Sequence, residues 1–417
     1  MKKILVIGSG GREHAIAYKF KCSPQVEEVY VAPGNPGMRD VATLVPIQTN
    51  EFDKLIEFVK ENKIDLTFVG PEIPLCAGIV DEFHKANLEI FGPTKAAAEL
   101  EGSKVFSKAM MKKYNIPTAK YESFSDYEQA KEYLQKQEMP IVLKADGLAA
   151  GKGVIIAMTM NEALQSLEEM MCNHLFDEAG SSVVIEEFLE GEEFSLLAFV
   201  NGDLVIPMQI AQDHKRAFDN DEGLNTGGMG AYTPVNHIPE SAYNDAVTNI
   251  VQAMASAMVK EGKSFLGILY GGCMLTKDGV KTIEYNVRFG DPETEVILPA
   301  LENDLVEVVE NTMKGIPTKL SWSNDAYCGV VMANKGYPES YQKGAVIEGL
   351  DVCNARVFHM GTSEKDGKIT ATGGRVLFVV MNGNTLKEAQ EAVYKEIEAI
   401  HCDSLFYRHD IGSKGIK

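Results

Sequence analysis

The chain of 417 residues is long enough for about two to four packed domains, and its 45% hydrophobic and 24% charged residues are typical of a globular protein. A formal net charge of −20 argues against nucleic acid or an anionic membrane surface as a partner, because both attract positive charge. The seven cysteines form no Cys-x-x-Cys pair, which argues against zinc and disulfides. No apolar run approaches the roughly 18 residues of a membrane span, so we expect a cytoplasmic protein.

Residues 1–102 show the alternation of strands and helices that predicts an open parallel α/β sheet. The expected strands are at 4–7, 29–32, 66–69 and 90–91. The carboxyl ends of parallel strands meet at one edge of a sheet, so the loops that follow the strands should lie together there. These loops are 8–14, 33–37 and 70–75.

A glycine-rich loop, Gly8-Ser9-Gly10-Gly11-Arg12, joins the first strand to a helix. Its backbone N–H groups and the helix N-terminus suit a phosphate, with Arg12 as a counter-charge. A dinucleotide site would require glycine at position 13 and an acid after the second strand, but the chain has Glu13 and Pro33 there. We therefore expect a sugar phosphate at this loop, with tight packing of the strand against the helix as the alternative.

Residues 103–325 are expected to form a second domain, with a smaller lobe at about 123–189. In that lobe, two strands flank the loop Asp146-Gly147-Leu148-Ala149-Ala150-Gly151-Lys152-Gly153. A Walker A motif would continue into a helix, whereas this loop continues into a strand, so it is predicted to be a β-hairpin flap. With Lys152 in the flap and Lys144 on the preceding strand, it can close over a triphosphate and exclude water. An exposed hairpin with solvated lysines is the alternative.

Two further segments carry polar side chains beside turns. The segment from Glu186 to Glu193 ends one strand and begins another, and its acids and backbone groups can bind the amine or hydroxyl groups of a nucleoside. A solvated acidic turn would have the same residues. Asp213 and Lys215 precede Thr226-Gly227-Gly228, and such a run of glycines is typical of a binding loop rather than of a stable element.

An Asp-Gly hairpin signal at 278–279 places residues 281–289 on a strand. Alternation would put Glu284, Asn286 and Arg288 on one face. The other face would hold the core residues Ile283, Tyr285, Val287 and Phe289. Acid and amide oxygens are ligands for Mg²⁺, and a neighbouring guanidinium binds a carboxylate or a phosphate. Taken alone, the pattern favours an ordinary half-buried strand with cross-strand ion pairs.

Residues 326–417 are expected to form a third, smaller α+β domain, with strands at 328–333, 356–359 and 375–381 and a helix at 386–399. Gly373-Gly374-Arg375 can either close a site or turn the chain, and we favour the turn.

The order of four motifs resembles the phosphoribosylamine–glycine ligase family of the ATP-grasp superfamily. The motifs are Gly8 to His14 with Gly34 to Gly37, Lys144 to Val154, Glu186 to Phe194, and Glu284 to Glu293. The resemblance covers nearly the whole chain and departs from the family at Glu295, where glutamine is usual. It implies an N-terminal parallel α/β domain, a central two-lobed ATP-grasp domain and a small C-terminal α+β domain.

The resemblance also implies a reaction, the second step of de novo purine biosynthesis. ATP would phosphorylate the carboxylate of glycine, and the amine of 5-phosphoribosylamine would attack the glycyl phosphate, giving glycinamide ribonucleotide, ADP and phosphate. Glu284 and Asn286 would hold Mg²⁺ or Mn²⁺. The expected catalytic residues are Arg288, Asp291, Lys144 and Asp213.

The resemblance assigns binding residues position by position. Those expected around ATP are Lys104, Lys144, Gly147, Gly151, Lys152, Gly153, Glu186, Glu187, Phe188, Leu189 and Glu193. Those expected around the two substrates are Gly10, Gly11, Arg12, Asn35, Pro36, Gly37, Asp213, Lys215, Thr226, Gly227, Gly228 and Arg288. The expected partners are small molecules only, and the expected state is a monomer or a weak homo-oligomer.

Two alternatives remain open from the sequence. The first is another ATP-grasp carboxylate–amine ligase or a carboxylase. The second is a non-catalytic nucleotide sensor that keeps the fold. Glu284, Asn286 and Arg288 argue against the sensor, which has no need of metal ligands and a carboxylate clamp together.

Overall fold

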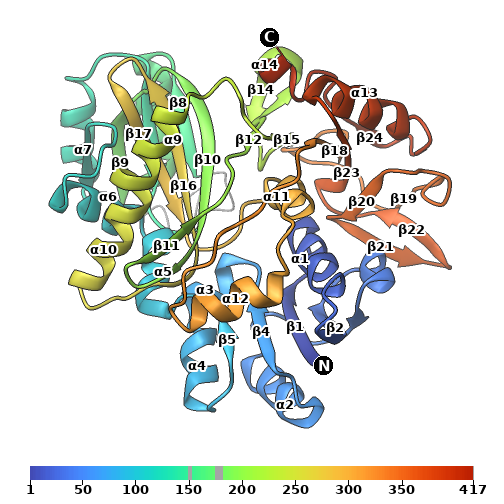
Figure 1. Ribbon diagram of the computed structural model, residues 1–417. Coiled ribbons are helices and arrows are strands. Elements are labelled where there is room, and N and C mark those ends of the chain that lie inside the picture. The colour runs from blue at the N-terminus through green and yellow to red at the C-terminus, as the bar shows by residue number, and fades with distance from the viewer. Residues whose placement is uncertain (149–152, 174–181, 417) are drawn as a thin grey trace.

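The structure is a computed structural model that describes residues 1–148, 153–173 and 182–416 (Figure 1). Its N-terminal part is a parallel sheet, as the apolar runs predict, with five strands in the order β3-β2-β1-β4-β5. β3 was not among the four expected strands. The strands are β1 (Lys2–Gly8), β2 (Val26–Pro33), β3 (Thr43–Leu44), β4 (Leu66–Val69) and β5 (Ile90–Phe91). The helices between and after them are α1 (Gly11–Lys21), η1 (Pro36–Asp40), α2 (Phe52–Asn62), α3 (Glu72–Ala77), α4 (Ile79–Lys85) and α5 (Lys95–Gly102).

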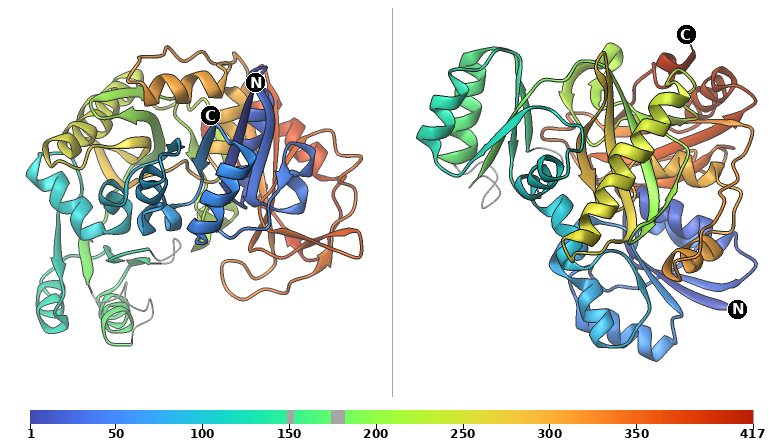
Figure 2. Two further views of the ribbon diagram at one scale, coloured as in Figure 1. Left: turned by 90° about the horizontal axis from the view of Figure 1, so that it is seen from below. Right: turned by 60° about the vertical axis from the view of Figure 1, so that its left-hand side comes forward.

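The smaller lobe is an antiparallel sheet in the order β6-β9-β7-β8 with two helices. Its elements are β6 (Tyr121–Phe124), α7 (Tyr127–Leu134), β7 (Ile141–Ala145), β8 (Val154–Ala157), α8 (Met160–Met171) and β9 (Val183–Glu187). Buried side chains of the helices and strands form a hydrophobic core that is separate from the main core. Figure 2 shows this lobe projecting from the rest of the molecule.

A second antiparallel sheet, β11-β10-β16-β17, faces the smaller lobe from the main body (Figure 1). Its strands are β10 (Glu192–Asn201), β11 (Leu204–Pro207), β16 (Leu266–Thr276) and β17 (Gly279–Asn286). The helices of this region are α6 (Lys104–Lys113), α9 (Glu240–Ala246), a π-helical stretch η4 (Val247–Gln252), α10 (Ala253–Lys260), α11 (Thr294–Ala300) and α12 (Leu305–Met313).

The C-terminal sheet takes in two strands from the middle of the chain. Its order is β12-β15-β18-β23-β20, and β24 also pairs with β18. The strands are β12 (Gln212–Asp213), β15 (Gly230–Thr233), β18 (Ala326–Asn334), β20 (Arg356–His359), β23 (Arg375–Gly383) and β24 (Leu405–Phe406). Because β12 and β15 precede residue 325, the segment between them, which includes Lys215 and Gly227, is attached to this sheet at both ends.

The remaining elements lie around that sheet. They are β13 (Arg216–Phe218), η3 (Asp219–Asp221), β14 (Glu222–Asn225), β19 (Ala345–Val346), β21 (Thr362–Lys365), β22 (Lys368–Ala371), α13 (Leu386–Ile397) and α14 (Ser413–Ile416). Within the described ranges, no helix is both long and apolar enough to cross a bilayer.

The strand expected at 281–289 differs from the prediction in two ways. β17 ends at Asn286, so Arg288 lies beyond the strand. The register with β16 also shifts between Gly272 and Cys273, because a bulge places Glu284 opposite Gly272 and Thr282 opposite Cys273. The bulge breaks the alternation, and Ile283, which was expected in the core, lines a pocket instead.

Candidate active site

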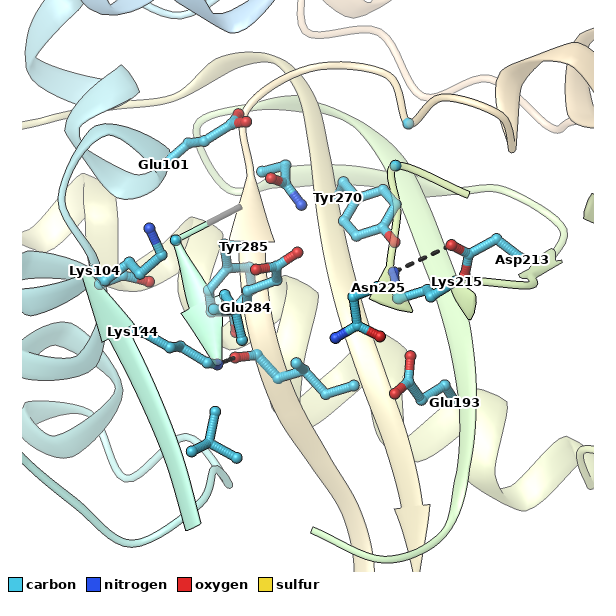
Figure 3. Close-up of a pocket in the computed structure, with 18 of the residues that line it drawn as sticks. Glu101, Lys104, Lys144, Glu193, Asp213, Lys215, Asn225, Tyr270, Glu284 and Tyr285 are labelled. Atoms are coloured by element: carbon cyan, nitrogen blue, oxygen red, sulfur yellow. Dashed lines mark hydrogen bonds and ion pairs between the residues drawn. The ribbon is translucent and has the colours of Figure 1, made fainter. Parts of the chain in front are cut away.

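A pocket of about 500 Å³ lies between the smaller lobe and the main body. It is lined by both antiparallel sheets, by α3, α5 and α6, and by residues from the loop 225–227 and from the start of β23. Figure 3 shows Glu284 on the floor of this pocket, with Lys104 and Lys144 on one side and Asp213 and Lys215 on the other. The parts of the chain that meet here are far apart in sequence, so the pocket depends on the whole fold.

One end of the pocket has two buried lysines on a single carboxylate. Lys144 of β7 and Lys108 of α6 form ion pairs with opposite oxygens of Glu186 on β9, and all three side chains are at least 90% buried. The Lys144 ammonium also donates to the carbonyl of Ile283 at 3.0 Å. Burial opposes ionisation of Glu186, but the two lysines outweigh it and lower its pKa. Burial likewise lowers the pKa of Lys108 to about 8, despite its pairing with Glu186.

Lys104 connects this end of the pocket to the flap. Its ammonium donates to the carbonyl of Gly147 at 2.9 Å, and burial lowers its pKa although Glu284 acts in the opposite direction. Gly147 has a φ of +92°, a left-handed conformation that favours glycine at this turn. Gly151 and Lys152, which were expected to cover a triphosphate, lie outside the described residues.

The middle of the pocket offers oxygen ligands for a cation. Burial opposes ionisation of Glu284, but Lys144 and Lys215 outweigh it and lower its pKa, so the group is a carboxylate at neutral pH. Asn286 presents its amide oxygen, which accepts from Arg288 at 3.2 Å. One carboxylate and one amide oxygen fit a hard divalent cation that takes its other ligands from phosphates and water. Among the described residues, no cluster of three or more acidic, histidine or cysteine side chains forms a more complete metal cage.

Arg288 is fixed by two carboxylates. Its Nη2 lies 2.8 Å from Oε1 of Glu101 on α5, and its Nε lies 3.3 Å from Oε2 of Glu72 on α3. The other oxygen of Glu101 accepts the backbone N–H of Val287 at 2.7 Å. Burial raises the pKa of Glu101 to about 7, although Arg288 acts to lower it. The clamp holds the guanidinium next to Asn286, where a substrate carboxylate beside a metal-bound phosphate would lie.

A second cluster of acids lies across the pocket from the lysines. Asp213 of β12 pairs with Lys215 at 3.2 Å. Glu293 accepts hydrogen bonds from Ser195 at 2.8 Å and from the Tyr270 hydroxyl at 2.9 Å. Burial raises the pKa of both Asp213 and Glu293. These groups can accept hydrogen bonds from an amine substrate.

Arg375 belongs to the site, in contrast to its interpretation as a turn residue. It begins β23, it lines the pocket, and its Nη1 lies 2.9 Å from the carboxylate of Asp291. The same nitrogen donates to the carbonyl oxygens of Gly227 at 2.8 Å and of Asp291 at 2.9 Å. The C-terminal part of the chain therefore supplies a side chain to the pocket.

Most of the expected site residues that the structure describes lie on this pocket. They are Arg12, Lys104, Lys144, Gly147, Gly153, Glu186, Glu187, Phe188, Leu189, Glu193, Asp213, Lys215, Thr226, Gly227, Glu284, Asn286, Arg288 and Asp291. Those that do not line it are Gly10, Gly11, Asn35, Pro36, Gly37 and Gly228.

The glycine loop at the start of α1 holds a side chain of its own helix. The backbone N–H groups of Ser9 and Gly10 donate to Oε2 of Glu13 at 3.2 and 2.6 Å. A Cβ on Gly8 or Gly70 would lie within 2.4 Å of the Glu13 side chain, so the glycines make room for this carboxylate. It therefore occupies the place at the helix start where a phosphate was expected, and only Arg12 of this loop reaches the pocket.

The loop 35–37 packs against the C-terminal part of the chain. The Asn35 amide donates to the carbonyl oxygens of Ser9 and His359 at 2.8 and 2.9 Å, and a Cβ on Gly37 would clash with the His359 ring. These contacts join β1, β2 and β20 rather than facing the pocket.

Sequence reasoning missed several residues of the pocket. Glu101, Lys108 and Tyr270 stand in helices and strands with no motif around them, so no local signal distinguishes them. Arg375 follows two glycines, a signal that favours a turn. Glu72 could have been found, because it follows β4 directly at the edge of the sheet where ligand loops gather.

Comparison with known proteins agrees with this architecture along the whole chain. Three family models match it: the phosphoribosylglycinamide synthetase N domain at residues 2–101, the ATP-grasp (A) domain at 102–294 and the C domain at 327–414. A curated protein from Halalkalibacterium halodurans, named phosphoribosylamine–glycine ligase, is 56% identical over 99% of this chain and 97% of its own length. One of the same name from Streptococcus pyogenes serotype M18 is 51% identical, with 100% of both chains covered.

Solved structures show the same relationship. The crystal structure of phosphoribosylamine–glycine ligase from Thermotoga maritima matches with a TM-score of 0.86 and 36% identity, over 98% of this chain and 99% of that one. A biotin carboxylase from Campylobacter jejuni, described as a complex with β-γ-ATP, matches with a TM-score of 0.74 over 97% and 93% of the two chains; at 14% identity it shares the fold alone. By its family models and its full-length relatives, the chain belongs to the phosphoribosylglycinamide synthetase family, the phosphoribosylamine–glycine ligases of the ATP-grasp fold.

Proposed function

We propose that the protein joins glycine to 5-phosphoribosylamine at the expense of ATP, through a glycyl phosphate, and releases glycinamide ribonucleotide, ADP and phosphate. This is the purine-biosynthetic reaction after which its relatives are named. The observation that carries the proposal is one pocket in which the lysines around Glu186, the oxygen ligands Glu284 and Asn286, and the clamped Arg288 lie side by side.

The nucleotide fits the end of the pocket beneath the smaller lobe. Lys104 and Lys144 would neutralise phosphates, and Gly147 and Gly153 would lie beside the phosphates. The turn after β9 would hold adenosine through Glu187, Phe188, Leu189 and Glu193. Similar folds are described with ATP or Mg-ADP bound, which supports this placement.

Glu284 and Asn286 would hold Mg²⁺ or Mn²⁺ between the phosphates and the substrate. When bound, the cation supplies positive charge at the junction of the phosphates and the glycine carboxylate, which otherwise repel each other. Lys144 and Lys215 keep Glu284 ionised and ready to coordinate.

Arg288 would orient the glycine carboxylate. One carboxylate oxygen attacks the γ-phosphorus of ATP, an oxygen–phosphorus bond forms, and ADP leaves with the electrons of the broken bond. The Arg288 guanidinium, held by Glu72 and Glu101, neutralises charge on the oxygens of the transferring group. Because Glu72 and Glu101 already hold the Arg288 side chain in place, it needs no reorganisation when charge develops in the transition state.

The second step joins the two substrates. The amine of phosphoribosylamine attacks the carbonyl carbon of glycyl phosphate, the carbon–oxygen bond breaks, and phosphate leaves. Asp213 and Asp291 face the pocket and would hold the amines of glycine and phosphoribosylamine, while Arg12, Lys215 and the loop Thr226–Gly227 complete the acceptor side. The smaller lobe would cover the acyl phosphate and protect it from water.

We also propose three domains, at residues 1–102, 103–325 and 326–417, and a cytoplasmic enzyme that is a monomer or a weak homo-oligomer. The net charge of −20 supports small-molecule substrates over nucleic acid.

A coupled assay of ADP release tests the function directly. Purified protein receives Mg-ATP, glycine and freshly made phosphoribosylamine, and the product is identified by mass. ADP release should require both co-substrates and should fall when another amino acid replaces glycine. ADP release that persists without phosphoribosylamine, or that is faster with bicarbonate than with glycine, would favour a different ATP-grasp reaction.

A further inference from the structure

Arg375 uses only one of its nitrogen atoms in contacts with the protein. Nη1 makes every hydrogen bond and ion pair of this guanidinium that involves described residues, to the carbonyl oxygens of Gly227 and Gly228 and to Asp291. The Nε–Nη2 edge, the fork that binds carboxylates and phosphates in a bidentate manner, has no partner among them. The side chain is 19% exposed and lines the pocket.

The backbone beneath Arg375 is shaped to accept the guanidinium. A Cβ on Gly227 would lie 3.0 Å from the guanidinium carbon and 3.1 Å from Nη2. A larger residue at 227 would crowd the planar group in this position. The Gly227 N–H donates at 3.0 Å to the hydroxyl of Tyr337, another C-terminal residue, so the loop is fixed from both sides.

A second arginine, Arg12, lies near the carboxylate of Asp291. Arg12 pairs with Glu13 at 2.6 Å and donates to the Phe289 carbonyl at 3.0 Å, while its Nη2 lies 3.9 Å from Glu72. Burial opposes protonation of Arg375, and Asp291 is the strongest of the charges that raise its pKa; Asp291 is also among the charges that raise the pKa of Arg12. Two permanent cations therefore lie around Asp291 on the pocket wall.

Arg375 is distinct from the cation assigned to glycine. Arg288 is occupied by Glu72, Glu101, Asn286 and the Phe289 carbonyl, and it lies beside the cation ligands. Arg375 is bound instead to the loop at 227 and to the turn at 291. The reaction brings three anionic groups into the pocket: the triphosphate, the glycine carboxylate and the phosphate ester of the acceptor. The first two are matched by the lysines and by Arg288.

We propose that Arg375 is a substrate-specificity residue that binds the 5-phosphate of phosphoribosylamine through its Nε–Nη2 edge, with Arg12 as the second cation of the same subsite. The inference rests on the proposed function and extends it, because it gives the C-terminal region a part in choosing the acceptor. In this arrangement Asp291 lies between the phosphate subsite and the reacting amine. Arg375 thus selects phosphorylated amines over their unphosphorylated counterparts.

The test compares two acceptors in four proteins. The acceptors are phosphoribosylamine and ribosylamine, which differ only in the phosphate, and the proteins are wild type, Arg375→Ala, Arg375→Lys and Arg39→Ala. Arg39 is the control arginine, because it too forms an ion pair with an acid far away in sequence, Glu364 at 2.5 Å, but is 58% exposed and does not line the pocket. kcat/KM is measured for each acceptor at saturating ATP and glycine, and a thermal melt of each protein confirms folding.

We expect Arg375→Ala to lower kcat/KM for phosphoribosylamine by roughly 10- to 100-fold, the effect of losing hydrogen bonds between charged groups, and to leave ribosylamine within about threefold. Arg375→Lys should fall between Arg375→Ala and wild type, because lysine keeps the charge without the fork. Arg39→Ala should match wild type. Equal losses for the two acceptors in Arg375→Ala would overturn the proposal and leave Arg375 as a positioning residue for Gly227 and Asp291.

A binding measurement separates this inference from the proposed function. Ribose 5-phosphate and ribose are titrated, without ATP, into wild type and Arg375→Ala, and we expect the preference of wild type for the phosphorylated sugar to disappear in the variant. An unchanged preference would overturn the phosphate assignment even if the enzyme is a ligase. A wild-type enzyme that makes no product from phosphoribosylamine would overturn the function and this inference together.

Discussion

Glu186 carries the counter-charge for two buried lysines, so its removal should lower the free energy of unfolding. Lys108 and Lys144 are each less than 7% exposed in their side chains and both pair with it. A buried charge that loses its partner is destabilising by roughly 3 kcal/mol or more. Glu186 therefore stabilises the fold and also holds Lys144 in place at the proposed nucleotide site.

The first prediction concerns that carboxylate. Glu186→Gln should lower the free energy of unfolding by about 3 kcal/mol, because Lys108 and Lys144 remain buried without a negative charge. The control is Glu187→Gln on the same strand, where the ion pair with Lys281 at 3.1 Å is partly exposed and should be worth less than about 1 kcal/mol. Urea denaturation of both variants measures the difference. Equal losses would contradict the role of burial in this cluster.

The second prediction concerns Glu295, a fully buried acid whose two oxygens have no hydrogen-bond partner among the described residues. Burial, reinforced by Asp291, raises its pKa far above the ordinary value. The native state then keeps a proton that the unfolded state loses, so the stability contributed at this site falls as the pH rises above the ordinary carboxyl pKa. Glutamine has nearly the same shape as a protonated glutamate but does not titrate.

Glu295→Gln should therefore be stabilised relative to wild type by an amount that grows as the pH rises from 5 to 8, a range above the ordinary carboxyl pKa of about 4.3. Parallel denaturation curves at several pH values measure the difference, and turnover at pH 7 should change little because the wild-type group is already neutral. A stability difference that is constant over this range would show that Glu295 is ionised in the folded protein.

The third prediction concerns the cation ligand and the carboxylate clamp. Glu284→Ala and Arg288→Ala should each lower turnover by roughly 10²-fold or more, the effect of removing one preorganised charge-stabilising group. Lys281→Ala on the same strand, away from the metal ligands, is the control and should retain most of the activity. Near-normal turnover in either test variant would refute the role given to that residue.

At the scale of elements, a bulge in the pairing of β17 determines which of its side chains reach the pocket. The bulge opposite Gly272 and Cys273 turns Ile283 toward the pocket and sets Glu284 opposite a glycine, which has no side chain to crowd the carboxylate. The strand then ends at Asn286, and Arg288 reaches Glu101 from the following turn. Strict alternation could not predict this, because a bulge depends on the register with the partner strand.

The C-terminal tail holds the loop that carries Asp213 and Lys215. Arg408 is 1% exposed and donates to Asp221 and to the Arg216 carbonyl, both at 3.0 Å, while Nη2 pairs with Asp410 at 2.7 Å. The N–H of Gly412 donates to His214 at 3.1 Å. The segment after β24 therefore stabilises the pocket wall without entering the pocket.

The fourth prediction tests this attachment. Arg408→Ala should lower the free energy of unfolding by roughly 1.5 kcal/mol or more, because the charged hydrogen bonds of this buried guanidinium to Asp221 and Asp410 are lost while the two carboxylates remain partly exposed. Lys414→Ala removes a partly exposed partner of the same Asp221, at 2.7 Å, and should cost less than about 1 kcal/mol. Hydrogen exchange of residues 213–228 should also be faster in Arg408→Ala alone. No change in exchange there would contradict a role for the tail in holding the loop.

At the scale of the whole molecule, local patterns predicted the sheets better than the contacts between them. The apolar runs at 4–7 and 66–69 are strands, as predicted, because strand formation depends mainly on near neighbours in sequence. The motif at 284–286 likewise lies on the pocket. Arg375 and Glu101 reach the pocket only through packing between distant segments. In the glycine loop, whose sequence predicts a phosphate site, the backbone N–H groups of Ser9 and Gly10 donate instead to Glu13 of the following helix, a contact that the loop's pattern did not reveal.

The central claim is that glycine is activated as an acyl phosphate in this pocket, and the fate of one oxygen atom tests it. In the proposed sequence a glycine carboxylate oxygen forms the bond to the γ-phosphorus and leaves with the phosphate when the amine attacks. With glycine labelled with ¹⁸O in both carboxylate oxygens, each phosphate released with glycinamide ribonucleotide should carry one labelled oxygen. Unlabelled phosphate in a reaction that still forms the amide would contradict the account.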